Sequence, residues 1–263
     1  MKGIDVSHYQ GNIDFDKVKA DGIEFCMIKA TEGQNFVDPK FKENAEKCTV
    51  HKGAYHFLRA TTVDDARKEA RFFLDTIKPY RFDFPLAIDA EAPELAALGK
   101  QKLTDVILAF NDVVRGAENY VILYSNKDWT ENKLDMARLS QIDLWYAYYH
   151  DAPGRACGMW QYSSTGRVNG ISGNVDMDIA FKDYPAIIQQ RGLNGFALPT
   201  MVQVPRGGYI TVTITGNVTA GDGAVIKTGR VSNTAIRLYG IGQPGQSTGI
   251  YSNGVRQLIT EIV

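Results

Sequence analysis

The sequence predicts an α/β fold: a barrel of eight short strands with about five helices, followed by a small all-β domain. Three observations support this fold class. Apolar runs of strand length alternate with amphipathic stretches, a pattern typical of a parallel sheet. The last three runs lie too close together for long helices between them, so the final third of the barrel is expected to be irregular. Beyond residue 195 the chain becomes rich in Gly and Thr and alternates with a period of two.

The barrel elements follow from these runs, taken in order. Strands are expected at residues 3–6, 23–29, 53–58, 86–89, 120–125, 144–149, 159–162 and 175–181. Helices are expected at residues 38–52, 63–78, 101–116 and 128–140. The helix at 63–78 follows Thr62, a residue type that caps helix N-termini, and its charges lie opposite its apolar positions.

A change in composition divides the chain into two domains. Gly192, Gly195, Pro199 and Pro205 interrupt the pattern, which predicts a linker at residues 191–204 between a domain at 1–190 and a β-rich domain at 205–263. The alternating run 209–215 and the turn residues after it indicate short strands and turns. Met201, within the linker, is also a candidate start for a separate short product.

Charge and composition exclude several function classes. Lys and Arg number 29 against 30 Asp and Glu, so the net charge of −1 gives no reason to expect a nucleic-acid partner. No run of 18 apolar residues is present, and Asp5 interrupts the start of the chain, so neither a membrane span nor a signal peptide is expected. Residues 196–263 nevertheless hold five cations and two anions. This excess favours an anionic polymer as the partner of the C-terminal domain.

The sequence contains no familiar metal, cofactor or nucleophile motif. The cysteines at 26, 48 and 157 form no C-x-x-C pair, and the histidines at 8, 51, 56 and 150 lack a zinc spacing. Ser7-His8 is not part of a G-x-S-x-G elbow, and no phosphate-binding loop is present. We therefore expect no cofactor and no metal.

Acids and aromatic residues recur where the expected strands end. In a parallel barrel the carboxyl ends of the strands carry the chemistry, because they meet at one face. Such a mixture suits a ligand with polar edges and flat apolar faces, as sugars have. The residues singled out at these ends are Asp5, Tyr55, His56, Asp89, Glu91, Tyr124, Trp145, Gln161 and Asp176.

Asp89 and Glu91 give the sharpest signal. Residues i and i+2 of a strand face the same side about 6.6 Å apart, and two such carboxyls raise each other's pKa. Glycoside hydrolysis needs a general acid beside a second carboxylate. The alternative is a pair of solvated loop acids or a helix cap, since Pro93 and Glu94 follow. Asp5 and Asp176 at other strand ends favour the catalytic interpretation. His56 has two interpretations, a structural hydrogen-bonding residue or part of a sugar groove.

Several segments together resemble glycoside hydrolase family 25, the Chalaropsis-type lysozymes common among bacteriophage endolysins. They are Gly3-Ile4-Asp5-Val6-Ser7-His8-Tyr9-Gln10-Gly11, Lys29-Ala30-Thr31-Glu32-Gly33, Gly53-Ala54-Tyr55-His56-Phe57, Asp89-Ala90-Glu91 and Trp160-Gln161-Tyr162-Ser163. The resemblance covers residues 1 to about 185 in the family's motif order. It implies an irregular (β/α)5(β)3 TIM-like barrel and cleavage of the β-1,4 bond from N-acetylmuramic acid to N-acetylglucosamine in peptidoglycan.

The resemblance also implies roles for individual residues. Glu91 resembles the general acid and Asp89 its acidic partner, with Asp5 and Asp176 as further acids. The residues placed along the sugar groove are Tyr55, Tyr124, Trp145 and Gln161, with His56 added from its strand-end position. Where the family often has Asp-x-Asn, this chain has Asp176-Met177-Asp178, and we expect Asp176 to face inward. Attack by the substrate's N-acetyl group and direct attack by water both remain open.

Two function classes follow. The first is an endolysin of a Gram-positive host, made in the cytoplasm without a signal peptide and released when a holin opens the membrane. Its domain at 205–263 is expected to bind the wall, in keeping with endolysins of this layout; otherwise it only stabilises the enzyme or forms a homo-oligomer. The second class is a non-catalytic wall-binding protein, and a prophage-encoded autolysin is a variant of the first. The acid cluster predicts a mildly acidic to neutral pH optimum.

Overall fold

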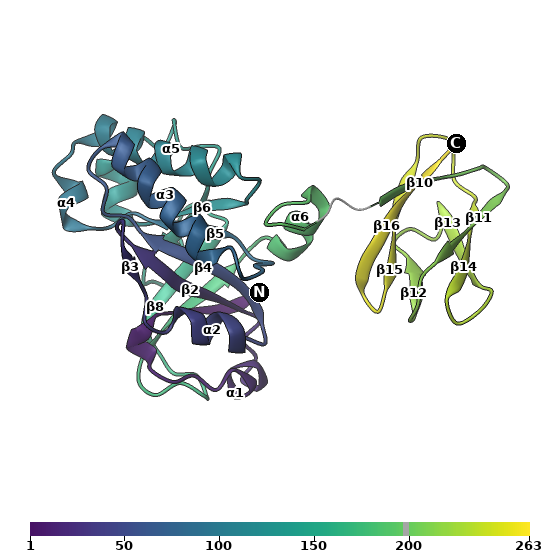
Figure 1. Ribbon diagram of the computed structural model, residues 1–263, viewed down its shortest axis with the longest axis horizontal. Helices are drawn as coiled ribbons and strands as arrows, with labels where there is room; N and C mark the ends of the chain where they lie inside the picture. Colours follow the sequence, from purple (N-terminus) through teal and green to yellow (C-terminus); the bar gives the residue numbers. More distant parts are fainter. Residues whose placement is uncertain (197–199) are drawn as a thin grey trace. The chain divides into compact units, whose positions relative to one another are not determined.

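The computed structural model of the protein describes residues 1–196 and 200–263 (Figure 1). The chain divides into two compact units, Met1–Phe196 and Ala197–Val263. This boundary lies within the predicted linker 191–204, of which residues 197–199 lie outside the described part. The predicted end of the linker at residue 204 is wrong, because Thr200–Val204 form strand β10, which pairs in parallel with strand β16 (Val255–Ile262). The C-terminal unit therefore includes residues that the sequence analysis assigned to the linker.

The N-terminal unit contains the predicted eight-stranded closed barrel. Its strands are β1 (Lys2–Val6), β2 (Phe25–Glu32), β4 (His51–Phe57), β5 (Leu86–Asp89), β6 (Val121–Asn126), β7 (Asp143–Ala147), β8 (Met159–Gly166) and β9 (Val175–Ala180). β1 through β8 form parallel neighbours in this circle, and β9 closes it by pairing antiparallel with both β8 and β1. A short strand that was not predicted, β3 (Phe36–Val37), folds back onto the end of β2.

Helices cover the outside of the barrel, and two of the four predicted ones are confirmed. These are α3 (Val63–Ile77) and α5 (Lys100–Gly116), which lie side by side (Figure 1). Thr62 caps α3 as expected, since its hydroxyl accepts a hydrogen bond from the Asp65 N–H. The shorter helices are α1 (Phe15–Ala20), α2 (Phe41–Lys47), α4 (Pro93–Ala96), α6 (Tyr184–Arg191) and a 3-10 turn η1 (His8–Gln10).

The other two helix predictions are wrong in extent. Helix α2 ends at Lys47, and His51 already belongs to β4. In the range 128–140 only Trp129–Lys133 is helical, as a single π turn. The buried apolar residues there are Trp129, Leu134 and Leu139. They recur every five residues, a spacing that an α-helix of 3.6 residues per turn cannot place on one face.

Two layers of apolar side chains fill the N-terminal unit, one inside the barrel and one under the helices. Phe25 and Met27 point into the barrel, whereas Cys26 and Ile28 pack outward, as the period of two requires. Gly3 must lack a side chain, because a Cβ there would lie 2.3 Å from the Phe25 ring. The aromatic interior leaves room for polar groups only toward the carboxyl ends of the strands.

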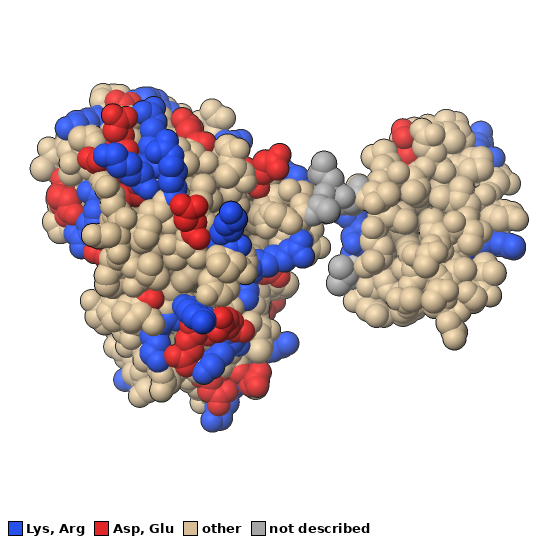
Figure 2. Space-filling model, in the orientation of Figure 1, with Lys and Arg blue, Asp and Glu red and all other residues tan. Residues whose placement is uncertain are grey.

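The C-terminal unit is all-β, as predicted. One sheet has the order β10-β16-β15-β12 and the other β11-β14-β13. The remaining strands are β11 (Tyr209–Thr213), β12 (Val218–Ala220), β13 (Ile226–Arg230), β14 (Ala235–Gly240) and β15 (Ser247–Ser252). A small apolar core that includes Val204, Ile236, Leu238, Ile250 and Ile262 draws residues from both sheets. Charged side chains are sparse on this unit and dense, with both signs mixed, on the visible face of the N-terminal unit (Figure 2).

Candidate active site

A cavity of about 290 Å³ opens at the carboxyl ends of the barrel strands. Four acids and one lysine line it, together with tyrosines, a tryptophan and two glutamines. The sequence analysis singled out eight of the lining residues: Asp5, Tyr55, Asp89, Glu91, Tyr124, Trp145, Gln161 and Asp176. They come from seven strands and from the segment after β5, so the barrel brings together residues as distant as Asp5 and Asp176. Further lining residues, not proposed as site residues, are Val6, Ser7, Tyr9, Gln10, Lys29, Phe57 and Tyr149.

The acidic pair lies where β5 ends. Asp89 is the last residue of the strand and only 6% exposed, and its Oδ1 is buried without a hydrogen-bond partner among the described residues. Burial and the neighbouring Glu91 raise the pKa of Asp89 well above its usual value. Burial and Asp176 raise the pKa of Glu91, while Lys29 opposes the rise at both carboxyls. The pair is therefore suited to hold one proton above the pH at which ordinary carboxyls ionise, as a general acid beside an anion requires.

Gln161 connects the second pair of acids to the aromatic wall. Its Nε2 donates to Asp5 Oδ2 at 2.8 Å, and its Oε1 accepts from the hydroxyls of Tyr124 at 3.0 Å and Tyr149 at 2.9 Å. Asp5 and Asp176 are direct partners across the antiparallel β1–β9 pairing. The sequence analysis placed Gln161 along the sugar groove. Its hydrogen bonds in the structure show that it also fixes the orientation of Asp5.

Asp178 is an additional acid beneath the cavity. Its side chain is fully buried, and Trp145 Nε1 donates to its Oδ1 at 2.7 Å. Burial raises the pKa of Asp178 to about 8, with a further contribution from Asp176. Burial, Asp178 and Asp176 in turn raise the pKa of Asp5. Asp176 lines the cavity and Asp178 lies deeper, so the two acids of this motif occupy different depths of one polar cluster.

Aromatic rings form the remaining walls. Trp145 packs edge-on against both Tyr124 and Tyr55, with ring centroids 4.7 and 6.2 Å apart. Tyr9 and Tyr149 lie at the opening with exposed fractions of 82% and 52%. Exposed aromatic rings beside carboxylates and an amide provide flat apolar faces together with hydrogen-bonding groups. The cavity thus has the features that recognition of a sugar chain requires.

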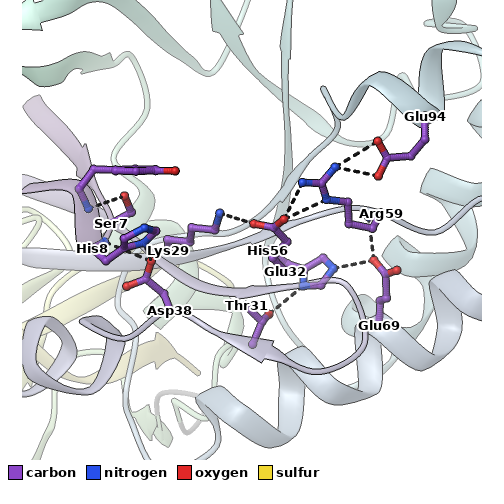
Figure 3. Close-up of polar contacts among 11 residues, drawn as sticks. Ser7, His8, Lys29, Thr31, Glu32, Asp38, His56, Arg59, Glu69 and Glu94 are labelled. Atoms are coloured by element: carbon purple, nitrogen blue, oxygen red, sulfur yellow. Dashed lines mark hydrogen bonds and ion pairs between the residues drawn. The ribbon is translucent and has the colours of Figure 1, made fainter.

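The prediction that His56 contacts substrate is wrong. Its side chain is fully buried, bonded through Nδ1 to Thr31 Oγ1 at 2.7 Å and through Nε2 to Glu69 Oε2 at 2.9 Å (Figure 3). Its ring stacks on Phe110 of α5, with centroids 4.8 Å apart. Burial lowers the pKa of His56, so the ring is neutral at pH 7. His56 joins the barrel to its helical cover.

In the described part of the chain, no cluster of three or more His, Cys, Asp or Glu side chains has an arrangement that would hold a metal ion. Among the helices of residues 1–196 and 200–263, none has the length and apolar character needed to cross a membrane.

Comparison with known proteins assigns the chain to a family. The model of glycosyl hydrolases family 25 matches residues 4–171. An autolytic lysozyme of Clostridium acetobutylicum is 33% identical over 186 residues, which are 68% of this chain and 55% of that protein. The crystal structure of the CTP1L endolysin has a TM-score of 0.64 at 29% identity, covering 79% of this chain and 74% of that one. A lysozyme from Streptomyces coelicolor has a TM-score of 0.62 at 27% identity, covering 74% and 96%.

These matches agree with the barrel. The chain spans about half the length of the Clostridium relative, and the family model lies entirely within the N-terminal unit. Because this model matches well over half of the 263 residues, the chain belongs to glycosyl hydrolases family 25.

Proposed function

We propose that the protein is an endolysin that hydrolyses the β-1,4 bond from N-acetylmuramic acid to N-acetylglucosamine in the peptidoglycan of a Gram-positive host. The observation that carries this proposal is the acidic pair, Asp89 and Glu91, in an aromatic-walled cavity of a family 25 barrel. The similarity to an autolytic lysozyme and to an endolysin supports the polymer as substrate. A protein that only binds the wall would have no need of the buried acidic pair.

In the proposed reaction Glu91 is the general acid. The pKa values of Glu91 and of the more deeply buried Asp89 are both raised, so the pair retains a proton, which Glu91 gives to the glycosidic oxygen as the bond from the anomeric carbon breaks. Asp89, as the anion of the pair, stabilises the positive charge that develops on the sugar. Either the carbonyl oxygen of the substrate's N-acetyl group or a water molecule forms the new bond to the anomeric carbon. The first route retains the configuration of the anomeric carbon and the second inverts it, so the product anomer distinguishes them.

We propose that the C-terminal unit holds the enzyme on anionic polymers of the wall. Residues 196–263 carry five cations against two anions. On β11 and β14, Arg237 lies 4.6 Å from the ring centroid of Tyr209, which is 51% exposed, and Tyr239 lies beside that ring. A cationic and aromatic face of this kind suits a charged glycan, and its binding should weaken as salt rises.

The deciding experiment is digestion of purified Gram-positive peptidoglycan, followed by borohydride reduction and mass analysis, with Glu91→Gln as the blank. We expect new reducing ends on N-acetylmuramic acid with the wild type and none with the variant. Sedimentation with the wall should be equal for both proteins. Intact glycan with bound wild-type protein would overturn the enzyme assignment in favour of a binding protein. Reducing ends on N-acetylglucosamine would show that the bond is wrongly assigned.

A further inference from the structure

Lys29 is the one cation among the residues that line the acidic cavity. It lies near the carboxyl end of β2, and its side chain is only 10% exposed. Its ammonium bonds Glu32 Oε2 at 2.7 Å and lies 4.8 Å from the centroid of the Phe57 ring. A buried ammonium with a carboxylate and an aromatic face beside it has a fixed position. The positive charge of Lys29 therefore has a fixed position at the wall of the cavity.

A chain of ion pairs, which we call the ladder, extends from Lys29 away from the cavity. Glu32 accepts from Lys29 on one oxygen, and its Oε1 accepts from Arg59 Nη2 at 2.7 Å and Nε at 2.9 Å. Arg59 Nη1 then reaches both oxygens of Glu94, at 2.8 and 3.1 Å (Figure 3). The ladder consists of Lys29, Glu32, Arg59 and Glu94. It joins β2, the segment after β4 and the first turn of α4.

The outer end of the ladder returns to the catalytic segment. Glu94 stands three residues after Glu91, in the short helix α4 that follows the acidic pair. The ladder thus fixes both the cation beside the pair and the backbone that carries it. The charged groups that share the cavity or the ladder with Lys29 are Asp5, Asp89, Glu91, Asp176, Glu32, Arg59 and Glu94, while His56 behind them is neutral.

We propose that Lys29 is a positioning residue for hydrolysis: the ladder locks its ammonium beside Asp89 and Glu91, where it favours the single-anion state of the pair. This inference rests on the proposed function. Without a nearby cation, burial would favour a pair that is doubly protonated at the pH of catalysis. Because Lys29 opposes the pKa rise at both carboxyls, its removal should move both pKa values upward. A purely structural lysine would lower activity without moving them.

The test compares Lys29→Met, Lys29→Arg and Arg59→Met with the wild type, using Arg67→Met as a matched control. Arg67 pairs with Asp64 on the outer face of α3. For Lys29→Met we expect both limbs of the kcat/KM profile to move up by roughly one pH unit. At the optimum kcat should fall by about tenfold. Lys29→Arg should restore the limbs, Arg59→Met should move them part of the way, and Arg67→Met should leave them in place.

Titration of the Asp89 and Glu91 carboxyls by ¹³C NMR provides a readout that does not depend on turnover. If the wild type cleaves no glycan, the proposed function fails, and the titration still shows whether Lys29 sets the charge of the pair. Unmoved limbs and unmoved carboxyl titrations in Lys29→Met would overturn the inference, even if kcat falls. If Lys29→Met does not fold, the pH profile and the carboxyl titrations are measured on Lys29→Arg and Arg59→Met instead. Carboxyl titrations in Arg59→Met that equal those of the wild type would then overturn the inference.

Discussion

Two clusters of charged side chains lie next to each other at the carboxyl face of the barrel, and they differ in how their carboxyls are paired. In the acidic cavity Asp5, Asp89 and Glu91 lie mainly among other acids, and their pKa values are raised. In the ladder Glu32 and Glu94 face Lys29 and Arg59. Burial raises the pKa of Glu32, but these cations outweigh it, and Arg59 lowers the pKa of Glu94. Both clusters are built on carboxyls, and deeper burial together with the lack of a bonded cation separates the cavity acids from the ladder acids.

The comparison teaches how to tell a reacting carboxyl from a structural one. A buried acid without a cation partner costs stability, because its charged form is poorly solvated. An acid bonded to Arg or Lys keeps its charge and restrains the backbone. The buried acids of the cavity therefore lower the stability of the fold but can transfer protons, whereas the ion pairs of the ladder hold the neighbouring backbone in place. Changing one acid in each cluster should affect activity in one case and mainly local order in the other.

The largest effect is expected for Asp89→Asn. This change removes the anion of the pair and should lower kcat on peptidoglycan by about 10²- to 10⁴-fold. The unfolding free energy should stay equal or increase, because a buried carboxyl without a partner for Oδ1 is replaced by a neutral amide. Turnover assays and urea unfolding measure the two quantities. A variant that is as active as the wild type would remove Asp89 from the mechanism.

The opposite pattern is expected for His56→Leu. Glu69 Oε2 would keep its bond from the Arg59 N–H at 3.0 Å but lose its histidine partner in a fully buried setting. The unfolding free energy should fall by about 2–3 kcal/mol. The folded fraction should keep its KM, since His56 lies outside the cavity. Denaturant unfolding together with kinetics per folded molecule checks this, and a raised KM at unchanged stability would return His56 to the groove.

Asp178 makes the stability of the protein depend on pH. The folded protein holds this proton up to about pH 8, whereas an unfolded aspartate loses it near its usual pKa of 3.8. Between these values the folded state binds more protons than the unfolded state, so the unfolding free energy falls as pH rises. Asp178→Asn removes this term and can still accept from Trp145 Nε1. The variant should therefore gain stability over the wild type between pH 4 and 8, and a constant difference across that range would contradict the shift.

Much of the site was predictable because strand ends of a parallel barrel meet at one face. Asp5, Asp89 and Asp176 needed only that rule. The error at His56 came from neglecting the period of two on its own strand. Tyr55 and Phe57 face the cavity, so the residue between them must face the helices.

The same period explains Asp176 and Asp178, whose spacing places both on one face at different depths. The sequence does not predict which charged side chains pair with each other. Nothing in the spacing of Lys29, Glu32, Arg59 and Glu94 predicts a ladder, because its long side chains come from β2, the segment after β4 and α4. The end of the linker could not be predicted for a similar reason. Strand β10 pairs with β16, which lies more than 50 residues away along the chain.

The smallest effect is expected for Glu94→Gln, which removes the outermost charge of the ladder. Its side chain is 37% exposed, and exposed ion pairs contribute about 0–1 kcal/mol, which salt screens further. Arg59 would still bond Glu32, so Lys29 would keep its partner. Only part of this small energy should reach the transition state, so kcat should fall by less than about threefold. Raising the salt concentration should lower wild-type activity toward that of the variant, because the wild type alone has this pair to lose. Measuring the activity ratio of the two proteins from low to high salt checks this. Two outcomes would contradict this: a wild-type-to-variant activity ratio that grows with salt, or a loss of kcat as large as that of Asp89→Asn. Either would show that the segment after β5 depends on Glu94 for more than its charge. The distinction between reacting and structural carboxyls would then fail.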